Sequence, residues 1–317
     1  MKAPSLSKLS NGSRLGSDLT VLGAIDPGSV EPVYIVWHHR SWCPMAVKIF
    51  TKPDRAKREA GILADLSHPN IVRLLGVEER RYMLMPFLEG RPLATVIDLA
   101  PNRRFRTSDA LRVAIHAGAA LQHVHERGFV HLDVKPGNVM ITSSGLPVLF
   151  DFGSARRIGA PRPAEVIGTD GYISPEECSL GEAGPASDVF GLGILLFEML
   201  TGELPFAAGT AKNRFPQFTD DPVRVRRRRP SLAKELDQLI LSCLSRNPDA
   251  RPSLSALLPR LHAHITNGPP MWPAGFDPDR GSDVRSDRKG AGSKRKRAIE
   301  ARVNSASACL HFRHCER

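Results

Sequence analysis

The sequence predicts an α+β fold with two lobes: a small β-rich N-terminal lobe that contains one helix, and a larger, mainly helical C-terminal lobe. Three observations carry this prediction. Short β-branched and alternating stretches dominate up to about residue 88, and helical periodicity dominates from residue 89 onward. The chain of 317 residues is also long enough for one two-lobed domain, and its hydrophobic content of 41% can supply a proper core.

The N-terminal lobe is predicted from stretches that alternate or are rich in β-branched residues. These predicted strands are Val33–Trp37, Ala46–Phe50, Val72–Val77 and Met83–Met85. Between the second and third strands lies one helix, predicted to begin at Asp54 as N-cap and to end near Leu66. A small sheet with a single helix is the expected result.

The C-terminal lobe is predicted from helical spacing of apolar residues. One helix runs from Thr107 to near Gly128, a second from Asp188 to Thr201, and a third begins at Ser231. The second is apolar nearly all round, as a buried helix should be. A hairpin of Val139–Ile141 with Pro147–Phe150 precedes Asp151.

The cysteines and the apolar runs of the sequence indicate the cellular compartment that we expect for the protein. The five cysteines are scattered without the paired spacing of a disulfide framework, which favours a reducing, cytoplasmic environment. The longest apolar run, Gly191–Phe197, is far too short to span a bilayer, and the polar start lacks the apolar region of a signal peptide. We therefore expect no membrane anchor.

The net charge of +11 is unevenly distributed along the chain. Residues 266–317 hold 11 of the 44 basic and 6 of the 33 acidic residues, so about half of the excess lies in this segment. Its composition predicts a disordered tail, and we treat the run of cysteines and histidines at Cys309–Cys315 as accidental rather than a zinc site. A second basic run, Arg226–Arg229, is expected in a solvated loop, so no nucleic-acid partner is expected.

Chemistry is indicated by an ordered set of side chains in residues 131–138 and 151–153. Moving a phosphoryl group needs a metal to neutralise charge, an anionic group to orient the acceptor hydroxyl, and a cation near the transferred group. Asp133, Lys135, Asn138 and Asp151 could supply these parts. Asp151 with Phe152 and Gly153 alone would be typical of a turn, but the ordered set rarely arises by chance.

These motifs make the sequence resemble the eukaryotic-like Ser/Thr protein kinases, particularly the compact bacterial members, from about Leu19 to Leu261. The resemblance implies the two-lobed protein-kinase-like fold. It divides the chain into a flexible N-terminus (1–18), a kinase domain (19–265, with lobes 19–88 and 89–265) and the basic tail (266–317).

The resemblance also implies roles for individual residues. Asp133 would be the catalytic base, Lys135 the cation near the γ-phosphate, and Asn138 and Asp151 the ligands of Mg²⁺. Lys48 would bind the phosphates of ATP. The further residues expected around the nucleotide are Glu59 as the ion-pair partner of Lys48, and Gly28, Val33, Ala46, Phe87, Leu88 and Met140.

The expected acceptor is a Ser or Thr hydroxyl of a protein. Small-molecule kinases with this fold usually lack a lysine two residues after the aspartate, whereas Lys135 is present here. The segment Gly168–Glu176 resembles the loop that positions a peptide, with Thr169 expected to contact Asp133 and Lys135. An ion pair is expected between Glu176 and Arg251. Asp188 is expected to bond residues 131–138, which we call the catalytic segment.

The glycine-rich loop departs from the family pattern. Aligned on Val33, the three family glycines fall on Asp26, Gly28 and Glu31, so only the middle one is kept. Glycines there let backbone N–H groups approach phosphates, and carboxylates should repel them. We expect weaker ATP binding. A pseudokinase that binds nucleotide or partners without turnover stays open as the alternative.

Regulation is also expected to differ. Leu132 stands where most family members have an arginine that receives a phosphorylated residue, and Ser154 is the only hydroxyl from Gly153 to Gly168. Activation by phosphorylation of this loop is therefore not expected.

Overall fold

The computed structural model describes residues 9–26, 29–161, 168–179 and 181–265. Gly28 and the predicted tail, 266–317, lie outside the described residues. The described residues form two compact units. Unit 1 contains residues 9–53 and 75–87, and unit 2 contains residues 54–74 and those from 88 onward.

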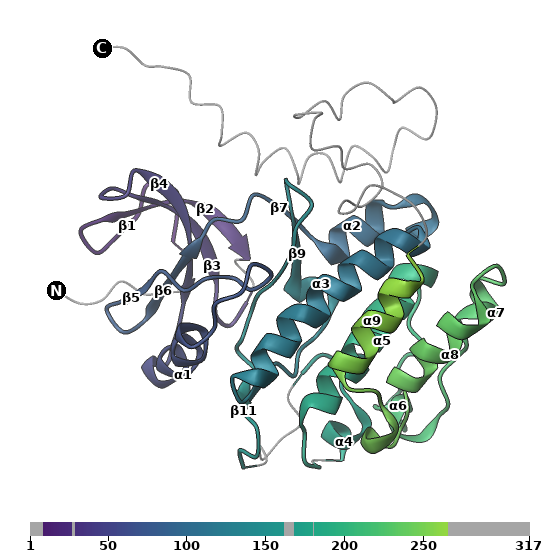
Figure 1. The fold of residues 1–317 in the computed structure, drawn as a ribbon. Coiled ribbons are helices and arrows are strands. Elements are labelled where there is room, and N and C mark those ends of the chain that lie inside the picture. The colour runs from purple at the N-terminus through teal and green to yellow at the C-terminus, as the bar shows by residue number, and fades with distance from the viewer. Residues whose placement is uncertain (1–8, 27–28, 162–167, 180, 266–317) are drawn as a thin grey trace, which may run out of the picture. The chain divides into compact units, whose positions relative to one another are not determined.

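Unit 1 is an antiparallel sheet with the strand order β1-β2-β3-β4-β6-β5 (Figure 1). The strands are β1 (Arg14–Leu15), β2 (Leu19–Asp26), β3 (Val33–His38), β4 (Cys43–Ile49), β5 (Gly76–Glu78) and β6 (Tyr82–Pro86). Successive side chains of a strand point to opposite faces, and in β3 Tyr34 and Val36 accordingly point to the buried face. They join one apolar cluster with Val21, Val47 and Leu84 from the neighbouring strands.

Three of the predicted strands of the first lobe are confirmed as β3, β4 and β6, but two parts of the sheet differ from expectation. Strand β2 was not predicted, because Gly23 and two register shifts interrupt its alternation. The predicted strand Val72–Val77 is wrong over most of its length, since only its last two residues belong to β5. Val72 instead donates its backbone N–H to the carbonyl of Leu149, in unit 2.

Unit 2 is mainly helical. Its helices are α1 (Pro53–Ala64), α2 (Leu93–Leu99), α3 (Thr107–Glu126), α4 (Pro175–Cys178), α5 (Pro185–Thr201), α6 (Pro216–Thr219), α7 (Val225–Arg228), α8 (Lys234–Cys243) and α9 (Leu254–Ala263). Its strands are β7 (Gly90–Pro92), β8 (Phe129–Val130), β9 (Val139–Thr142), β10 (Pro147–Leu149) and β11 (Arg156–Arg157). Helix α1 groups almost entirely with this unit, although the sequence analysis placed it with the strands.

Helix α5 forms the centre of unit 2, as its all-round apolar sequence predicted. Helix α3 packs against both α5 and α9 (Figure 1), and α5 also packs against α8. Gly193 makes the last contact possible, because a Cβ at this position would lie 2.8 Å from the Cβ of Cys243. The helix ends at Gly202, whose φ of 74° is the left-handed conformation of a helix C-cap.

Two predicted helix starts are corrected by the structure. Helix α1 begins at Pro53, which suits a first turn because proline has no N–H to lose, so Asp54 lies inside that turn and is not the N-cap. Helix α8 begins at Lys234 rather than Ser231, because Leu232 still donates to Arg229 in a turn.

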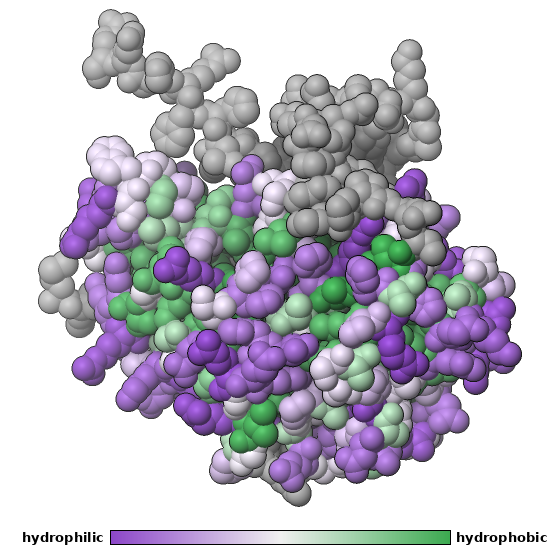
Figure 2. Space-filling view, in the orientation of Figure 1, coloured by the Kyte–Doolittle hydropathy of each residue, from purple (hydrophilic) through white to green (hydrophobic). Residues whose placement is uncertain are grey.

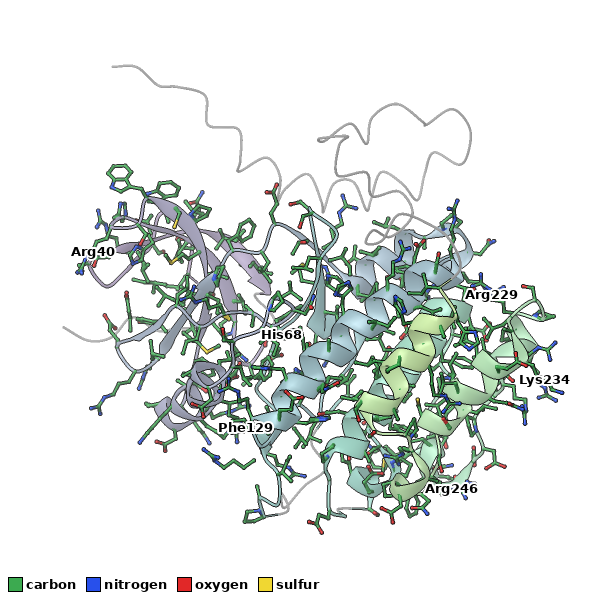
Figure 3. The ribbon with its side chains drawn as sticks, viewed as in Figure 1. Arg40, His68, Phe129, Arg229, Lys234 and Arg246 are labelled. Carbon is green, nitrogen blue, oxygen red and sulfur yellow. The ribbon has the colours of Figure 1, made fainter. Side chains whose placement is uncertain are left out.

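The basic run Arg226–Arg229 was expected in a loop but mostly forms the single helical turn α7. Its arginines have local partners: Arg228 lies 2.9 Å from Glu203, and Arg229 donates to the carbonyl of Phe105 (2.8 Å). Hydrophilic residues dominate the visible surface over α7 and α8 in Figure 2, and Figure 3 labels Arg229, Lys234 and Arg246 in this part. The run is a solvated basic surface, and the contacts with Glu203 and Phe105 hold two of its arginines in place.

Candidate active site

The β9–β10 hairpin brings the two predicted metal ligands to one end. Val139 pairs with Leu149 in antiparallel register, and the next residue pair continues this pattern, since the N–H of Phe150 donates to the carbonyl of Asn138 (3.0 Å). Asp151 follows directly after Phe150. Asn138 and Asp151 therefore leave the same end of the hairpin, as the sequence analysis expected of a hairpin that delivers Asp151.

The carboxylate of Asp133 lies at the centre of a hydrogen-bond network. Lys135 Nζ donates to Asp133 Oδ2 (2.7 Å) and to Thr169 Oγ1 (2.5 Å), and Thr169 Oγ1 donates to Asp133 Oδ1 (3.0 Å). Asn138 Nδ2 also donates to Asp133 Oδ2 (2.7 Å). The predicted contacts of Thr169 with Asp133 and Lys135 are thus confirmed.

Asn138 and Asp151 have the donor chemistry that Mg²⁺ requires. Asn138 uses its amide nitrogen for Asp133, donating also to the backbone carbonyl of that residue (2.8 Å), so its oxygen is the end that can bind a cation. Asp151 contributes a carboxylate, of which Oδ1 accepts from the N–H of Gly153 (3.3 Å). Carboxylate and amide oxygens are the ligands of this hard cation, so these two residues fit a Mg²⁺ ion.

Asp188 of α5 anchors the catalytic segment through the backbone N–H groups of that segment. Its side chain is fully buried and accepts from the backbone N–H of His131 (2.9 Å) and of Leu132 (2.8 Å), while His125 Nε2 lies 2.8 Å away. Burial by itself would raise the pKa of Asp188, but the bonds and charge of His125 and His131 outweigh it and lower that pKa. The predicted tie between Asp188 and this segment is confirmed.

The anchor holds Leu132 in an uncommon conformation. Leu132 has a φ of 62°, which is rare for residues other than glycine and costs free energy. His131, fully buried, accepts from the N–H of Asp133 (3.3 Å) and contacts Phe152 edge-on at 4.7 Å between ring centres. Neither His125 nor His131 was given a role from the sequence. His131 opens the 131–138 motif, but His125 lies on a helix, and no local pattern links it to Asp188.

Glu176 and Arg251 form the predicted ion pair. It is bidentate, with Arg251 Nη1 and Nη2 donating to the two carboxylate oxygens at 2.8 and 2.7 Å, and Ser187 Oγ donates to Glu176 as well (2.6 Å). Burial alone would raise the pKa of Glu176, but the bonds and charge of Arg251 hold that pKa below its usual range. The pair ties α4 to the segment before α9.

Lys48 lies on β4, in unit 1, and its side chain is only 7% exposed. Val33 pairs with it in register across β3, and its Nζ lies 3.5 Å from Glu31 Oε2. Ala46 and Phe87 share this unit, whereas Glu59, Leu88 and Met140 belong to unit 2. The ion pair predicted between Lys48 and Glu59 therefore stays a prediction.

Among the described residues, none of the helices combines the length and the apolar character needed to cross a membrane. Three cysteines of this part, Cys43, Cys178 and Cys243, are free thiols.

Comparison with known proteins points to one family. The protein kinase domain model matches residues 19–262. The chain is 32% identical over 233 residues to the serine/threonine-protein kinase PknB of Mycobacterium tuberculosis, which covers 68% of this chain and 36% of that protein. It is 34% identical over 253 residues to the serine/threonine-protein kinase PksC of Streptomyces coelicolor, covering 74% of this chain and 45% of the relative.

A third relative is the DNA damage-responsive serine/threonine-protein kinase RqkA of Deinococcus radiodurans, 30% identical over 275 residues, which are 80% of this chain and 40% of that protein. The chain thus matches less than half the length of each of these relatives. Among solved structures, the kinase domain of Mycobacterium tuberculosis PknI has a TM-score of 0.64 at 24% identity and covers 81% of this chain and 99% of its own, which supports the fold. By its match over residues 19–262, this chain belongs to the protein kinase domain family.

Proposed function

We propose that the chain is a Ser/Thr protein kinase that transfers the γ-phosphoryl group of ATP, with Mg²⁺, to a protein hydroxyl. The observation that carries the proposal is the network around Asp133, in which Lys135, Asn138 and Thr169 all bond one carboxylate. Three partners fix the direction of this carboxylate before substrate arrives. Such preorganisation is what positioning catalysis needs.

Each member of the network has a proposed task. Asp133 would accept the proton of the acceptor hydroxyl, and Lys135 would neutralise charge on the transferred group. Asn138 and Asp151 would hold Mg²⁺, which supplies charge neutralisation on the phosphates. Lys48 would hold the phosphates from unit 1, assisted by Glu59, with Val33, Ala46, Phe87, Leu88 and Met140 beside the nucleotide.

The position of Thr169 supports a protein as the acceptor of the phosphoryl group. Its hydroxyl bonds both Asp133 and Lys135, so the segment that follows it, up to Glu176, is linked directly to the proposed base. Glu176 is in turn fixed by Arg251. A segment held at both ends beside the proposed base supports an extended peptide as acceptor, and gives a small molecule little additional contact.

The cellular location belongs to the same proposal. The free thiols among the described residues support a reducing compartment, and we place the activity in the cytoplasm.

The test is phosphoryl transfer by the purified chain. The protein is incubated with γ-labelled ATP and Mg²⁺, separately with generic basic proteins and with a panel of small alcohols and amines, and the products are identified by mass spectrometry. We expect phosphoserine or phosphothreonine on protein, and none with EDTA. Label on the small molecules alone would replace the proposal with a small-molecule kinase.

A further inference from the structure

Glu31 and Lys48 form a buried ion pair inside unit 1. Lys48 Nζ lies 3.5 Å from Glu31 Oε2, and both side chains are 7% exposed. A lysine in such a place is desolvated, so its charge is compensated by a carboxylate of the chain itself. The cation proposed to hold the phosphates of ATP therefore already has an anion beside it.

The strand register fixes Glu31 in this position. Val33, the first residue of β3, lies opposite Lys48, and the pairing continues one step further because the N–H of Ile49 donates to the carbonyl of Pro32 (3.0 Å). Glu31 directly precedes this paired segment. Its own N–H donates to Ser29 Oγ (3.3 Å). The carboxylate thus reaches Lys48 from a backbone that the sheet holds.

The pair matters because the phosphates of ATP and the carboxylate of Glu31 would compete for the ammonium group of Lys48. A nucleotide phosphate that bonds Lys48 must either displace the carboxylate of Glu31 or bind beside it. Displacement breaks the ion pair between Lys48 and Glu31, which has little solvent around it. Binding beside Glu31 brings the negative phosphate close to the negative carboxylate in the same poorly solvated site. Either way the phosphates bind with less free energy than Lys48 alone would provide.

We propose that Glu31 is an internal counter-ion that competes with the phosphates of ATP for Lys48 and so weakens nucleotide binding. This inference rests on the proposed function, in which Lys48 binds those phosphates. It predicts a penalty that depends on the phosphates and leaves the binding of the nucleoside part alone. Glu31 is therefore an affinity-setting residue of this chain.

The experiment is a titration of the full chain and of Glu31→Gln with MgATP and with adenosine, followed by calorimetry. Glutamine keeps the size of the side chain and removes its charge. We expect Glu31→Gln to bind MgATP about tenfold more tightly, and adenosine within about twofold of the parent protein. The adenosine arm separates competition for Lys48 from a general change in the site.

Three further proteins complete the test: Asp18→Asn, Lys48→Met, and the double variant with Lys48→Met and Glu31→Gln. Asp18→Asn is the matched control, since Asp18 pairs with Arg40 (2.7 Å) in the same unit, next to the opposite end of β3. It removes one negative charge and should leave the affinity for MgATP within about twofold. In a Lys48→Met background, Glu31→Gln should improve MgATP binding much less, because the two effects are coupled.

The possible outcomes are distinct. Unchanged MgATP affinity in Glu31→Gln, with phosphoryl transfer intact, overturns the inference and leaves the proposed function standing. An equal gain for adenosine also overturns it. If Glu31→Gln does not fold, Glu31→Ala is titrated instead, and failure of both to fold makes Glu31 a structural residue and overturns the inference. Failure of every protein, parent included, to bind MgATP overturns both proposals.

Discussion

Two lysine–carboxylate pairs lie in the two units of this molecule, and they differ in what surrounds them. Lys135 lies 2.7 Å from Asp133, with exposed fractions of 23% and 11% for the two side chains, and a hydroxyl and an amide bond the same carboxylate. Lys48 lies 3.5 Å from Glu31, and both side chains are 7% exposed. Asp133 and Lys135 both belong to the motif of residues 131–138. Lys48, in contrast, pairs with Glu31, which stands where the family has the third glycine of its glycine-rich loop.

The difference lies in the groups around each carboxylate: Asp133 accepts from three side chains, and Glu31 lies beside Lys48. In unit 2, Lys135 and Thr169 bond each other and both bond the carboxylate of Asp133, which is the preorganisation that the proposed phosphoryl transfer would use. In unit 1 the pair satisfies the lysine without nucleotide. A chain of this kind should retain a competent catalytic step and bind ATP weakly.

The largest expected effect concerns the first pair. Asp133→Asn keeps the size of the side chain but removes the proton acceptor, so turnover should fall by about 10³-fold, within the range for loss of a general base. ATP affinity should stay within about twofold, because Lys48, which is proposed to hold the phosphates, is unchanged. Steady-state transfer and calorimetry measure both. Asp151→Asn is the contrast, since it should weaken Mg²⁺-dependent binding as well, and near-wild-type transfer by Asp133→Asn would refute the assignment.

A second effect tests the ion pair that ties α4 to the segment before α9. Glu176→Gln leaves the buried guanidinium of Arg251 without its anion and should destabilise unit 2 by about 3 kcal/mol near neutral pH. The pKa of Glu176 is lowered in the folded chain, so its stabilisation is present above the usual value of 4.5 and is lost as pH falls below it. Urea unfolding at several pH values should show the two proteins converging in acid. A constant difference at all pH values would contradict this account.

The neighbouring carboxylate should behave in the opposite way. Burial raises the pKa of Glu177 to about 7, and Ser174 Oγ, which donates to it (2.7 Å), only partly offsets this. A raised pKa means that stability is full below 4.5 and is lost as pH rises through about 7. The free energy of unfolding of Glu177→Gln should therefore be about 2 kcal/mol higher than that of the parent at pH 8, and equal to it at low pH. Urea unfolding that shows no gain at pH 8 would contradict the burial argument.

The smallest expected effect concerns regulation. Leu132 offers no cation for a phosphate, and its backbone is already held by Asp188. Ser154→Ala and phosphatase-treated protein should therefore match the parent in rate within about twofold, without a lag. Time courses of transfer measure this. A lag that shortens with autophosphorylation at Ser154 or Thr169 would assign the missing role to a nearby arginine such as Arg156 or Arg157.

The contacts implied by the resemblance to the kinase family agree best with the structure. They are the bonds of Thr169, the pairing of Glu176 with Arg251 and the anchoring by Asp188. The helix α5 was also predicted because an all-round apolar stretch has few alternatives to burial.

The sequence analysis was least successful where register and tertiary contacts decide. No local pattern could place Glu31 beside Lys48, since that contact needs the β3–β4 pairing. Val72, Arg73 and Leu74 alternate between apolar and charged as a strand does, yet Val72 donates its N–H to the carbonyl of Leu149 within unit 2. The strand β2 was hidden by its bulges, which break the alternation that identifies a strand.

The most direct test of the central claim is the dependence of transfer on ATP concentration. The unmodified chain is assayed with Mg²⁺ and a basic acceptor protein from about 1 μM to about 10 mM ATP, a range that extends past ordinary KM values. Asp133→Asn serves as the blank. We predict transfer that rises with ATP and saturates only near the upper end of this range. Measurable MgATP binding without transfer above the blank at any concentration would contradict the account and identify the chain as a pseudokinase.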